Sequence, residues 1–170
     1  MNNFQILESS ILIICSLLIG WLISEVKKLK TKQALPIQTN QKESNSLKLQ
    51  ALERLTLFTE RCTLANLIER NLVQGMLASE LHQLLVATIK SEYEYNITQQ
   101  IYVSADIWSS ITRMKDQNIY IINHIIASLP QNATGFDLSK LIIEYTSTPN
   151  AEMNSILLDA LQFEAKKILN

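Results

Sequence analysis

An apolar run near the start of the chain constrains the fold most strongly. Residues 9–26 are almost wholly apolar between Ile11 and Ile23, and the run extends upstream as far as Phe4. About 20 helical residues cross the hydrocarbon core of a bilayer, and Phe4 to Ile23 meets that length, with Trp21 near one interface. We therefore predict an N-terminal transmembrane helix. The alternative, a buried core helix, is disfavoured by the lysines that follow the run.

Charges beside the apolar run predict its orientation. No Lys or Arg precedes the run, whereas four lysines follow it at once, namely Lys27, Lys28, Lys30 and Lys32. By the positive-inside rule, the N-terminus lies outside and the C-terminal part lies in the cytoplasm. A cleavable secretory signal would carry its positive charge ahead of the run instead. The predicted location is the inner cell membrane, as a single-pass protein whose lysines attract membrane lipid.

Composition divides the chain into three parts. Residues 1–32 form the predicted anchor with its lysine-rich flank, residues 33–46 form a flexible polar linker, and residues 47–170 form a cytoplasmic domain. Up to Ser46 there are five Lys against three Glu, whereas beyond it there are ten Lys and Arg against thirteen Asp and Glu. A mildly acidic domain lacks the basic surface of a nucleic-acid binder, so we expect no nucleic-acid partner.

The domain carries the apolar periodicity of amphipathic helices, with apolar residues three and four positions apart. We predict helices from Leu47 to about Asn71, from Ser79 onward, from Ser104 to Pro130, from Phe136 to Tyr145 and from Pro149 onward. Each helix needs a partner for its apolar face. The expected fold is therefore all-α, with the transmembrane helix and linker followed by a compact bundle of four to five helices.

Three local features refine this expectation. The residues around Ile101 to Val103 are aromatic and β-branched, which indicates a short extended stretch. Ser104 and Ser79 are the expected N-caps of their helices, and Gly135 is expected to supply a positive φ in a turn. No internal repeat of fixed period is evident.

Motifs for catalysis and for cofactor binding are absent from the sequence. It contains no glycine-rich phosphate loop, no G-x-S-x-G elbow, no H-E-x-x-H and no paired C-x-x-C. His82 and His124 each lack a second His or Cys at ligand spacing. Glu92 and Glu94 are two positions apart, so they would not face each other on a helix. We expect a protein that is not an enzyme and that holds no cofactor and no metal.

One segment of the domain is the candidate site for a protein partner. Asn96, Gln99 and Gln100 are amides that need hydrogen-bond partners if they are buried, and Tyr102 and Trp108 are aromatic residues that can anchor a partner. Two structural alternatives stay open. The amides would fasten the chain to neighbouring backbone groups, and Trp108 would belong to the core.

A second candidate site lies within the apolar run. Ser16, Gly20 and Ser24 recur every four residues and therefore share one helical face. Small residues at this spacing let transmembrane helices approach closely. This face is a candidate for homodimer formation through the transmembrane helix.

A run in the second half of the chain carries a family resemblance. From Glu92 to Ser104 the chain reads Glu-Tyr-Glu-Tyr-Asn-x-x-Gln-Gln-Ile-Tyr-Val-Ser, and Trp108 and Lys115 follow. Together with the apolar run, the lysine cluster and the linker, this sequence resembles a family of small, uncharacterised, membrane-anchored bacterial proteins. The resemblance implies a single-pass helical protein and supplies no catalytic residue, because no activity is assigned to that family.

Three functions are compatible with these features. The preferred one is a noncatalytic adaptor or scaffold at the cytoplasmic face of the membrane, which holds a protein partner in a groove of its helical domain. A ligand-binding sensory or regulatory module would instead need a pocket lined by Tyr93, Tyr102 and Trp108. An enzyme of unfamiliar type would need acid and base groups that converge on a cleft.

Overall fold

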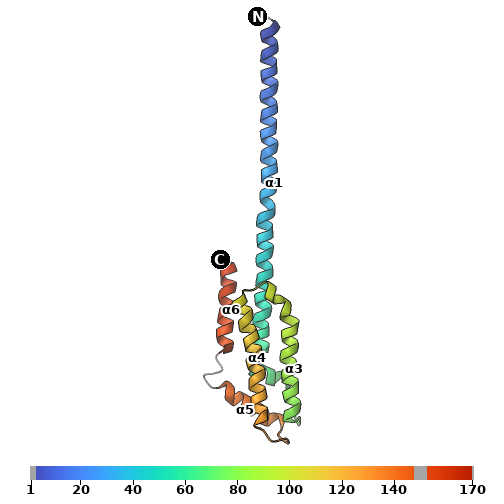
Figure 1. Cartoon of the computed structure of the whole chain (residues 1–170), viewed down its shortest axis with the longest axis vertical. Coiled ribbons are helices and arrows are strands. Elements are labelled where there is room, and N and C mark those ends of the chain that lie inside the picture. Colours follow the sequence, from blue (N-terminus) through green and yellow to red (C-terminus); the bar gives the residue numbers. More distant parts are fainter. Residues whose placement is uncertain (1–2, 148–152, 170) are drawn as a thin grey trace. The chain divides into compact units, whose positions relative to one another are not determined.

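The computed structural model describes residues 3–147 and 153–169, and it confirms the all-α class over these residues. Figure 1 shows the chain as a succession of helices joined by short connections. The helices are α1 (Asn3–Arg61), α2 (Leu64–Asn71), α3 (Ala78–Asn96), the 3₁₀ helix η1 (Ile97–Ile101), α4 (Ala105–Ala127), α5 (Gly135–Thr146) and α6 (Met153–Leu169).

The chain divides into two compact units, Met1–Asn45 and Ser46–Asn170. The first unit contains the N-terminal part of α1, and the second contains the last turns of α1 together with α2 to α6. Residues 33–46, which the sequence analysis assigns to a linker, are helical and lie within α1. Among the side chains of the first unit that the structure describes, the large apolar ones are exposed, and these are Ile14, Leu17, Leu18, Ile19, Trp21, Leu22, Ile23 and Val26.

The predicted transmembrane helix is not found. Within residues 3–147 and 153–169, no helix combines the length and the apolar character needed to cross a membrane. A span requires about 20 predominantly apolar residues. Where the structure describes the side chains of α1, the apolar run ends at Ile23, and Ser24 and Glu25 follow. The prediction of a single-pass transmembrane anchor is therefore wrong for the described part of the chain.

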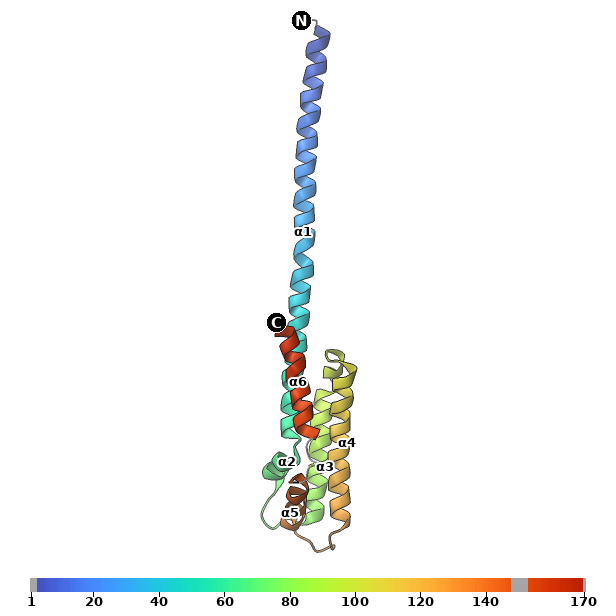
Figure 2. The ribbon, with the colours of Figure 1, turned by 90° about the vertical axis from the view of Figure 1, so that its left-hand side faces the viewer.

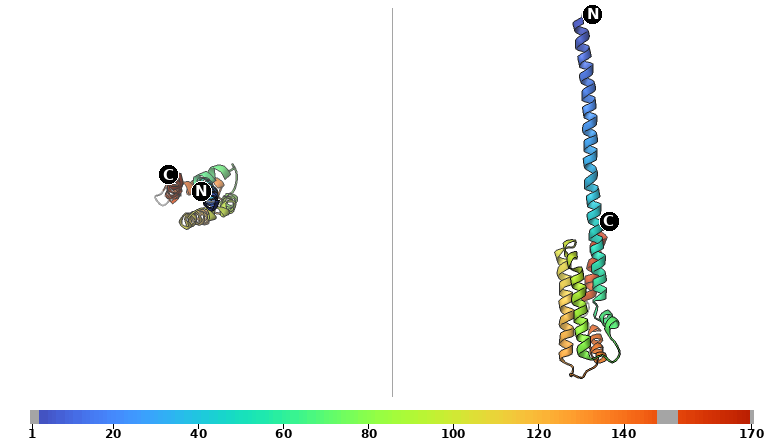
Figure 3. Two further views of the ribbon diagram at one scale, coloured as in Figure 1. Left: turned by 90° about the horizontal axis from the view of Figure 1, so that it is seen from above. Right: turned by 90° about the vertical axis from the view of Figure 1, so that its right-hand side faces the viewer.

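The second unit is built around the antiparallel helices α3 and α4. These helices are joined by η1 and lie side by side, as Figure 2 and the right-hand view of Figure 3 show. Ser104 caps the start of α4, since its side chain accepts a hydrogen bond from the backbone N–H of Ile107. This confirms the prediction that Ser104 is the N-cap of this helix. The predicted extended stretch around Ile101 to Val103 is wrong, because Ile101 ends the 3₁₀ helix and a turn follows.

Two groups of buried apolar residues form the core of this unit. One group joins α1, α4 and α6 and consists of Leu52, Leu55, Phe58, Cys62, Ile107, Ile111, Met114, Leu157 and Leu161. The other joins α2, α3, the second half of α4 and α5, and consists of Leu64, Leu67, Ile68, Ala78, Leu81, Leu85, Ile89, Ile121, Ile122, Ala133, Leu138 and Ile142. Helix α4 contributes to both groups and therefore connects them.

Two helix–loop–helix pairs meet at their loops. The α2–α3 loop and the α4–α5 loop form a short antiparallel bridge between Leu77 and Thr134. The backbone N–H of Ala78 donates to the carbonyl of Ala133 over 2.9 Å, and the N–H of Gly135 donates to the carbonyl of Met76 over 2.7 Å. Because buried backbone polar groups need partners, these two hydrogen bonds satisfy the loops where they meet at the buried residues Ala78, Ala133 and Gly135.

The two pairs are related by an internal repeat that the sequence analysis did not detect. The bonded positions in the second loop follow those in the first by 57 residues (133 − 76 and 135 − 78). The same offset relates the caps, since the N–H of Leu77 donates to the Glu80 carboxylate and the N–H of Thr134 donates to the Asp137 carboxylate. Leu72, Gln74, Leu81 and Leu84 recur as Leu129, Gln131, Leu138 and Leu141.

Glycine supports the two loops in two ways. Gly75 has φ 85°, a left-handed conformation that glycine adopts without strain, whereas Gly135 does not have a positive φ, contrary to the prediction. Gly135 instead serves close packing, because a Cβ there would lie 3.0 Å from the Met76 side chain and 3.2 Å from the Met76 carbonyl oxygen.

The prediction of Ser79 as the N-cap of α3 is wrong. Helix α3 begins at Ala78, and Leu77 occupies the cap position. The predicted start of the last helix at Pro149 lies outside the described residues.

Replacement of Gly135 by valine should destabilise the second unit. The new side chain would press on the Met76 carbonyl and weaken the hydrogen bond between the loops, at a cost of about 1–3 kcal/mol in the free energy of unfolding. Chemical denaturation measures this change. Glu144→Val introduces the same β-branched residue at an exposed position of α5 and should cost clearly less. Equal losses for the two variants would contradict the role of Gly135.

The cap at the start of α5 should make stability depend on pH. Hydrogen bonds from the Thr134 hydroxyl and then from its backbone N–H lower the pKa of Asp137. A carboxyl whose pKa is lowered in the folded state stabilises the fold above its ordinary pKa of about 3.9, and that stabilisation disappears as the pH falls through the lowered pKa. Asp137→Asn should therefore lower the melting temperature at neutral pH, and the difference from the wild type should shrink in strong acid. A difference that stayed constant down to the acid limit would contradict this assignment.

Candidate functional site

One face of α1 in the second unit is exposed along its length. The residues that α1 buries there lie on one side of the helix and are Ala51, Leu52, Leu55, Phe58, Thr59 and Cys62. The opposite side carries Gln50 and Leu57, and Leu57 is 57% exposed. A leucine that is this open on an ordered helix is available for contact with another molecule. We refer to the surface around Gln50 and Leu57 as the α1 face.

The α1 face has one acidic edge and one basic edge. With 3.6 residues per turn, Glu53 and Glu60 lie roughly 40–60° to one side of Leu57. Arg54 and Arg61 lie at roughly the same angle on the other side. The sequence signal for this arrangement is the dipeptide Glu-Arg, which occurs at 53–54 and again seven residues later at 60–61. The sequence analysis did not use it.

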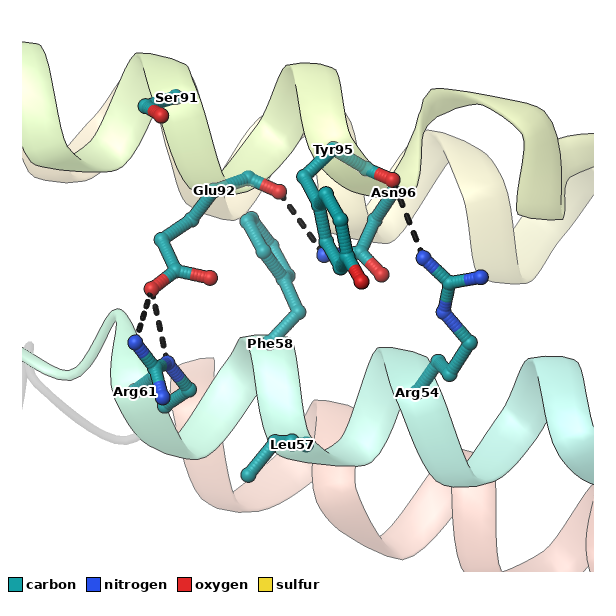
Figure 4. A pocket seen from close by; sticks show the side chains of 8 residues that line it. All are labelled: Arg54, Leu57, Phe58, Arg61, Ser91, Glu92, Tyr95 and Asn96. Carbon is teal, nitrogen blue, oxygen red and sulfur yellow. Dashed lines mark hydrogen bonds and ion pairs between the residues drawn. The ribbon is translucent and has the colours of Figure 1, made fainter.

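A cleft separates the basic edge from α3. Its volume is about 650 Å³. Figure 4 shows Arg54 and Arg61 reaching from α1 toward α3, with the ring of Phe58 between them. The residues that line the α1–α3 cleft are Arg54, Leu57, Phe58, Arg61, Ser91, Glu92, Tyr95 and Asn96. Of the residues predicted for partner binding, only Asn96 lines this cleft.

Glu92 holds one end of the cleft together. Its carboxylate oxygen Oε1 accepts a hydrogen bond from Nε of Arg61 over 2.7 Å and forms an ion pair with Nη2 of the same arginine over 2.6 Å. Arg70 of α2 lies 3.7 Å from the same oxygen and donates to the backbone carbonyl of Arg61. One half-buried carboxylate thereby ties the C-terminal ends of α1 and α2 to α3, and charge-assisted bonds of this kind are among the stronger ones in proteins.

Arg54 holds the other end. Its Nη2 donates to the backbone carbonyl of Tyr95 over 3.1 Å, and its guanidinium carbon lies 4.9 Å from the centre of the Tyr95 ring. The last carbonyls of a helix carry partial negative charge and lack partners within the helix. Arg54 therefore stabilises the C-terminal end of α3. The Tyr95 ring itself is 74% exposed and stands at the mouth of the cleft.

A second groove separates the acidic edge of the α1 face from α6. Its volume is about 690 Å³. The lining is mainly apolar, and the ionisable residues among it are all acidic. The residues that line the α1–α6 groove are Leu49, Leu52, Glu53, Thr56, Leu57, Glu60, Leu158, Asp159, Leu161, Gln162, Ala165 and Leu169. Leu57 lines both the α1–α3 cleft and the α1–α6 groove. It therefore lies between a cleft that contains arginines and a groove that contains carboxylates.

The predicted amides stabilise the turn between α3 and α4. Asn96 and Gln99 are buried, whereas Gln100 is exposed. The Asn96 amide donates to the carbonyl of Glu92 over 2.8 Å, and the Gln99 amide donates to the Thr98 hydroxyl over 3.0 Å. The two buried amides are therefore bonded within the turn.

The aromatic residues predicted for binding do not form one pocket. Trp108 and Tyr102 are both half-buried. The Trp108 ring stacks on the ring of Tyr93 with 5.3 Å between centroids, and both rings pack against the core group that contains Phe58. Lys115 lies 4.8 Å from the centre of the Tyr93 ring. Tyr93 and Trp108 thus pack together beside the core, and neither lines the α1–α3 cleft or the α1–α6 groove.

The small-residue face of the apolar run lies in the first unit. Ser16, Gly20 and Ser24 are exposed on α1, and a Cβ placed on Gly20 would meet no atom within 4 Å beyond its chain neighbours and the backbone of its own helix. The prediction of a homodimer through a transmembrane helix loses its premise, because no such helix is found in the described part of the chain.

Two observations bear on chemical reactivity. Burial, and secondarily the charge of Glu92, raise the pKa of the Cys62 thiol to about 12, so this thiol stays protonated at neutral pH. A thiol that stays protonated is a poor nucleophile. Across the side chains that the structure describes, no group of three His, Cys, Asp or Glu residues could hold a metal ion.

The second unit is an all-helical fold with two bridged helix–loop–helix pairs. Its α1 face is exposed and carries acidic residues along one edge and basic residues along the other. Residues 2–168 match a family of unknown function, DUF7935, and the chain belongs to that family. This confirms the predicted resemblance as far as it concerned an uncharacterised family. No curated protein and no solved structure matches the chain.

Loss of the Glu92 carboxylate should weaken the attachment of α1 to α3. Glu92→Ala removes the acceptor of Arg61 and Arg70, and we expect a loss of about 1–3 kcal/mol in the free energy of unfolding. Glu94→Ala is the matched control, because Glu94 is exposed two residues further along α3. Chemical denaturation of both variants measures the difference. A Glu92 variant as stable as the Glu94 variant would contradict the proposed tie.

Proposed function

We propose that the protein is a noncatalytic adaptor or scaffold whose α1 face binds a helix of another polypeptide. The observation that carries this proposal is the exposure of Leu57 between two concave surfaces of opposite charge. An apolar residue at the centre of a contact, with charged residues around it, is the usual composition of a protein interface.

A helix suits the α1 face better than an extended strand. Strand addition needs a sheet edge with unpaired backbone groups, and the part of the chain that the structure describes contains no β-strand. A helix that lies along α1 can place an apolar residue on Leu57 and further apolar residues in the α1–α6 groove. It binds with charged residues that match the acidic edge on one side and the basic edge on the other.

The sensory-module alternative is less well supported. It required a pocket lined by Tyr93, Tyr102 and Trp108, and two of these rings stack on each other beside the core. The α1–α3 cleft offers arginines to an anionic ligand, but both arginines already bond to α3. Their observed partners account for the positions of these side chains without a ligand.

Photo-cross-linking tests the proposed function. A benzoylphenylalanine placed at Gln50 of the full-length chain lies on the α1 face, whereas one placed at Ser109 lies on an exposed part of α4. We expect irradiation in cells to give one discrete adduct from position 50 and none from position 109. The adduct should trace to one peptide of the captured protein.

A disrupting substitution makes this test specific. Leu57→Lys changes an exposed position and leaves helix propensity nearly the same, so the fold should persist while the adduct from position 50 disappears. An adduct that survives Leu57→Lys, or equal adducts from positions 50 and 109, would contradict the proposal.

A further inference from the structure

The geometry of the α1 face points to a second copy of this chain as its occupant, and this inference rests on the proposed function. We propose that residues 46–61 of two copies pair as parallel, in-register helices around Leu57. The two charged edges of the α1 face fit one two-fold arrangement of the helices, the parallel one, and conflict with the antiparallel one. Interfaces between identical chains commonly have two-fold symmetry.

Symmetry decides which edges meet. In a parallel pair, the two-fold axis runs along the helices and brings the basic edge of one copy against the acidic edge of the other. In an antiparallel pair, the axis crosses the helices and brings basic edge against basic edge and acidic edge against acidic edge. Like charges that face each other across an interface are repulsive. The charges of the α1 face therefore favour the parallel pair.

The spacing of the charges then fixes the register. Arg54 follows Glu53 directly, and Arg61 follows Glu60 directly. Each residue rises 1.5 Å along a helix. With Leu57 opposite the partner's Leu57, Arg54 lies about 1.5 Å along the axis from the partner's Glu53, and Arg61 lies equally close in height to the partner's Glu60. The same two contacts form on the other side, which gives four ion pairs around an apolar centre.

The groups needed for these ion pairs have bonding capacity left. A guanidinium carries five N–H donors, and within one copy Arg54 uses one on Tyr95 while Arg61 uses Nε and Nη2 on Glu92. Neither Glu53 nor Glu60 forms an ion pair with any residue that the structure describes. Their carboxylates are exposed and stand on the edge that meets the partner's arginines.

Parallel pairing also sets the two concave surfaces against each other. Helix α3 borders the basic edge and α6 borders the acidic edge, so the α1–α3 cleft of each copy lies next to the α1–α6 groove of the other. The exposed ring of Tyr95 then faces the side of the groove that carries Leu158 and Leu169, and Leu169 is 70% exposed. Apolar surface that is open in a single copy becomes covered.

Charge reversal tests the pairing in the full-length protein. The variant E53R/E60R carries arginine on both edges, and R54E/R61E carries glutamate on both edges. Each variant alone should lose dimer affinity by about tenfold or more, because four attractive contacts become repulsive. An equimolar mixture should recover affinity to near the wild-type value, since the basic variant then faces the acidic one. Analytical ultracentrifugation measures all three dissociation constants.

Two controls keep the test decisive. Circular dichroism and thermal melting must show each variant folded, and E53R/E60R is the safer one, because it leaves the bonds of both arginines within the chain intact. The wild-type dimer should also weaken as salt rises from low to high concentration, since exposed ion pairs are screened. A dimer that is indifferent to charge reversal and to salt would overturn the inference.

The cross-link from Gln50 separates this inference from the proposed function. An adduct with twice the mass of the chain supports self-pairing and, of the proposed function, only that the α1 face binds a helix. If the adduct contains a different protein while the wild type sediments as a monomer, the adaptor function stands and self-pairing is wrong. If no adduct forms and the wild type is a monomer, both are wrong.

Discussion

The fold of the second unit depends on two backbone hydrogen bonds between loops that lie 57 residues apart (133 − 76). Backbone N–H and carbonyl groups that become buried must find partners, and at the contact between these loops each loop supplies the partner of the other. The bridge fixes the N-terminal ends of α3 and α5. The apolar faces of these two helices then complete one core with α2 and α4. Gly135 is required at the point of closest approach, where a side chain would meet the backbone of Met76.

The position of the α1 face follows from contacts at the other end of α3. Arg54 bonds to the last turn of α3, and Arg61 bonds to Glu92 one turn earlier, so α1 is attached through the same two residues that form its basic edge. The buried side of α1 packs through Phe58 and Leu55 on α4 and α6. With three sides of the helix occupied, Leu57 is left on the fourth. The attachment of α1 and the exposure of the α1 face thus have one structural origin.

Local signals in the sequence predicted local structure well. Ser104 acts as an N-cap because that interaction involves residues three apart, and apolar periodicity located most helices. The repeat was missed because its equivalent residues include Leu77 with Thr134, which differ in chemistry, and Gly75 with Asn132, which differ in chemistry and in backbone conformation. Burial of Asn96 and packing of Trp108 depend on which helices become neighbours. The α1 face was missed for the same reason. The charge pattern of Glu53, Arg54, Glu60 and Arg61 indicates an exposed face only once the other side of α1 is known to be buried. The apolar run was overinterpreted from composition alone.

A disulfide test of helix direction addresses the central claim most directly. Gln50 lies two turns before Leu57 on the α1 face, so in a parallel, in-register pair the two copies of residue 50 are neighbours, whereas in an antiparallel pair they lie at opposite ends of the contact. In a full-length Cys15→Ser protein, Gln50→Cys should oxidise rapidly to a disulfide-linked dimer, and Ser109→Cys should not. A Gln50→Cys protein that stays monomeric under the same oxidant would contradict the account.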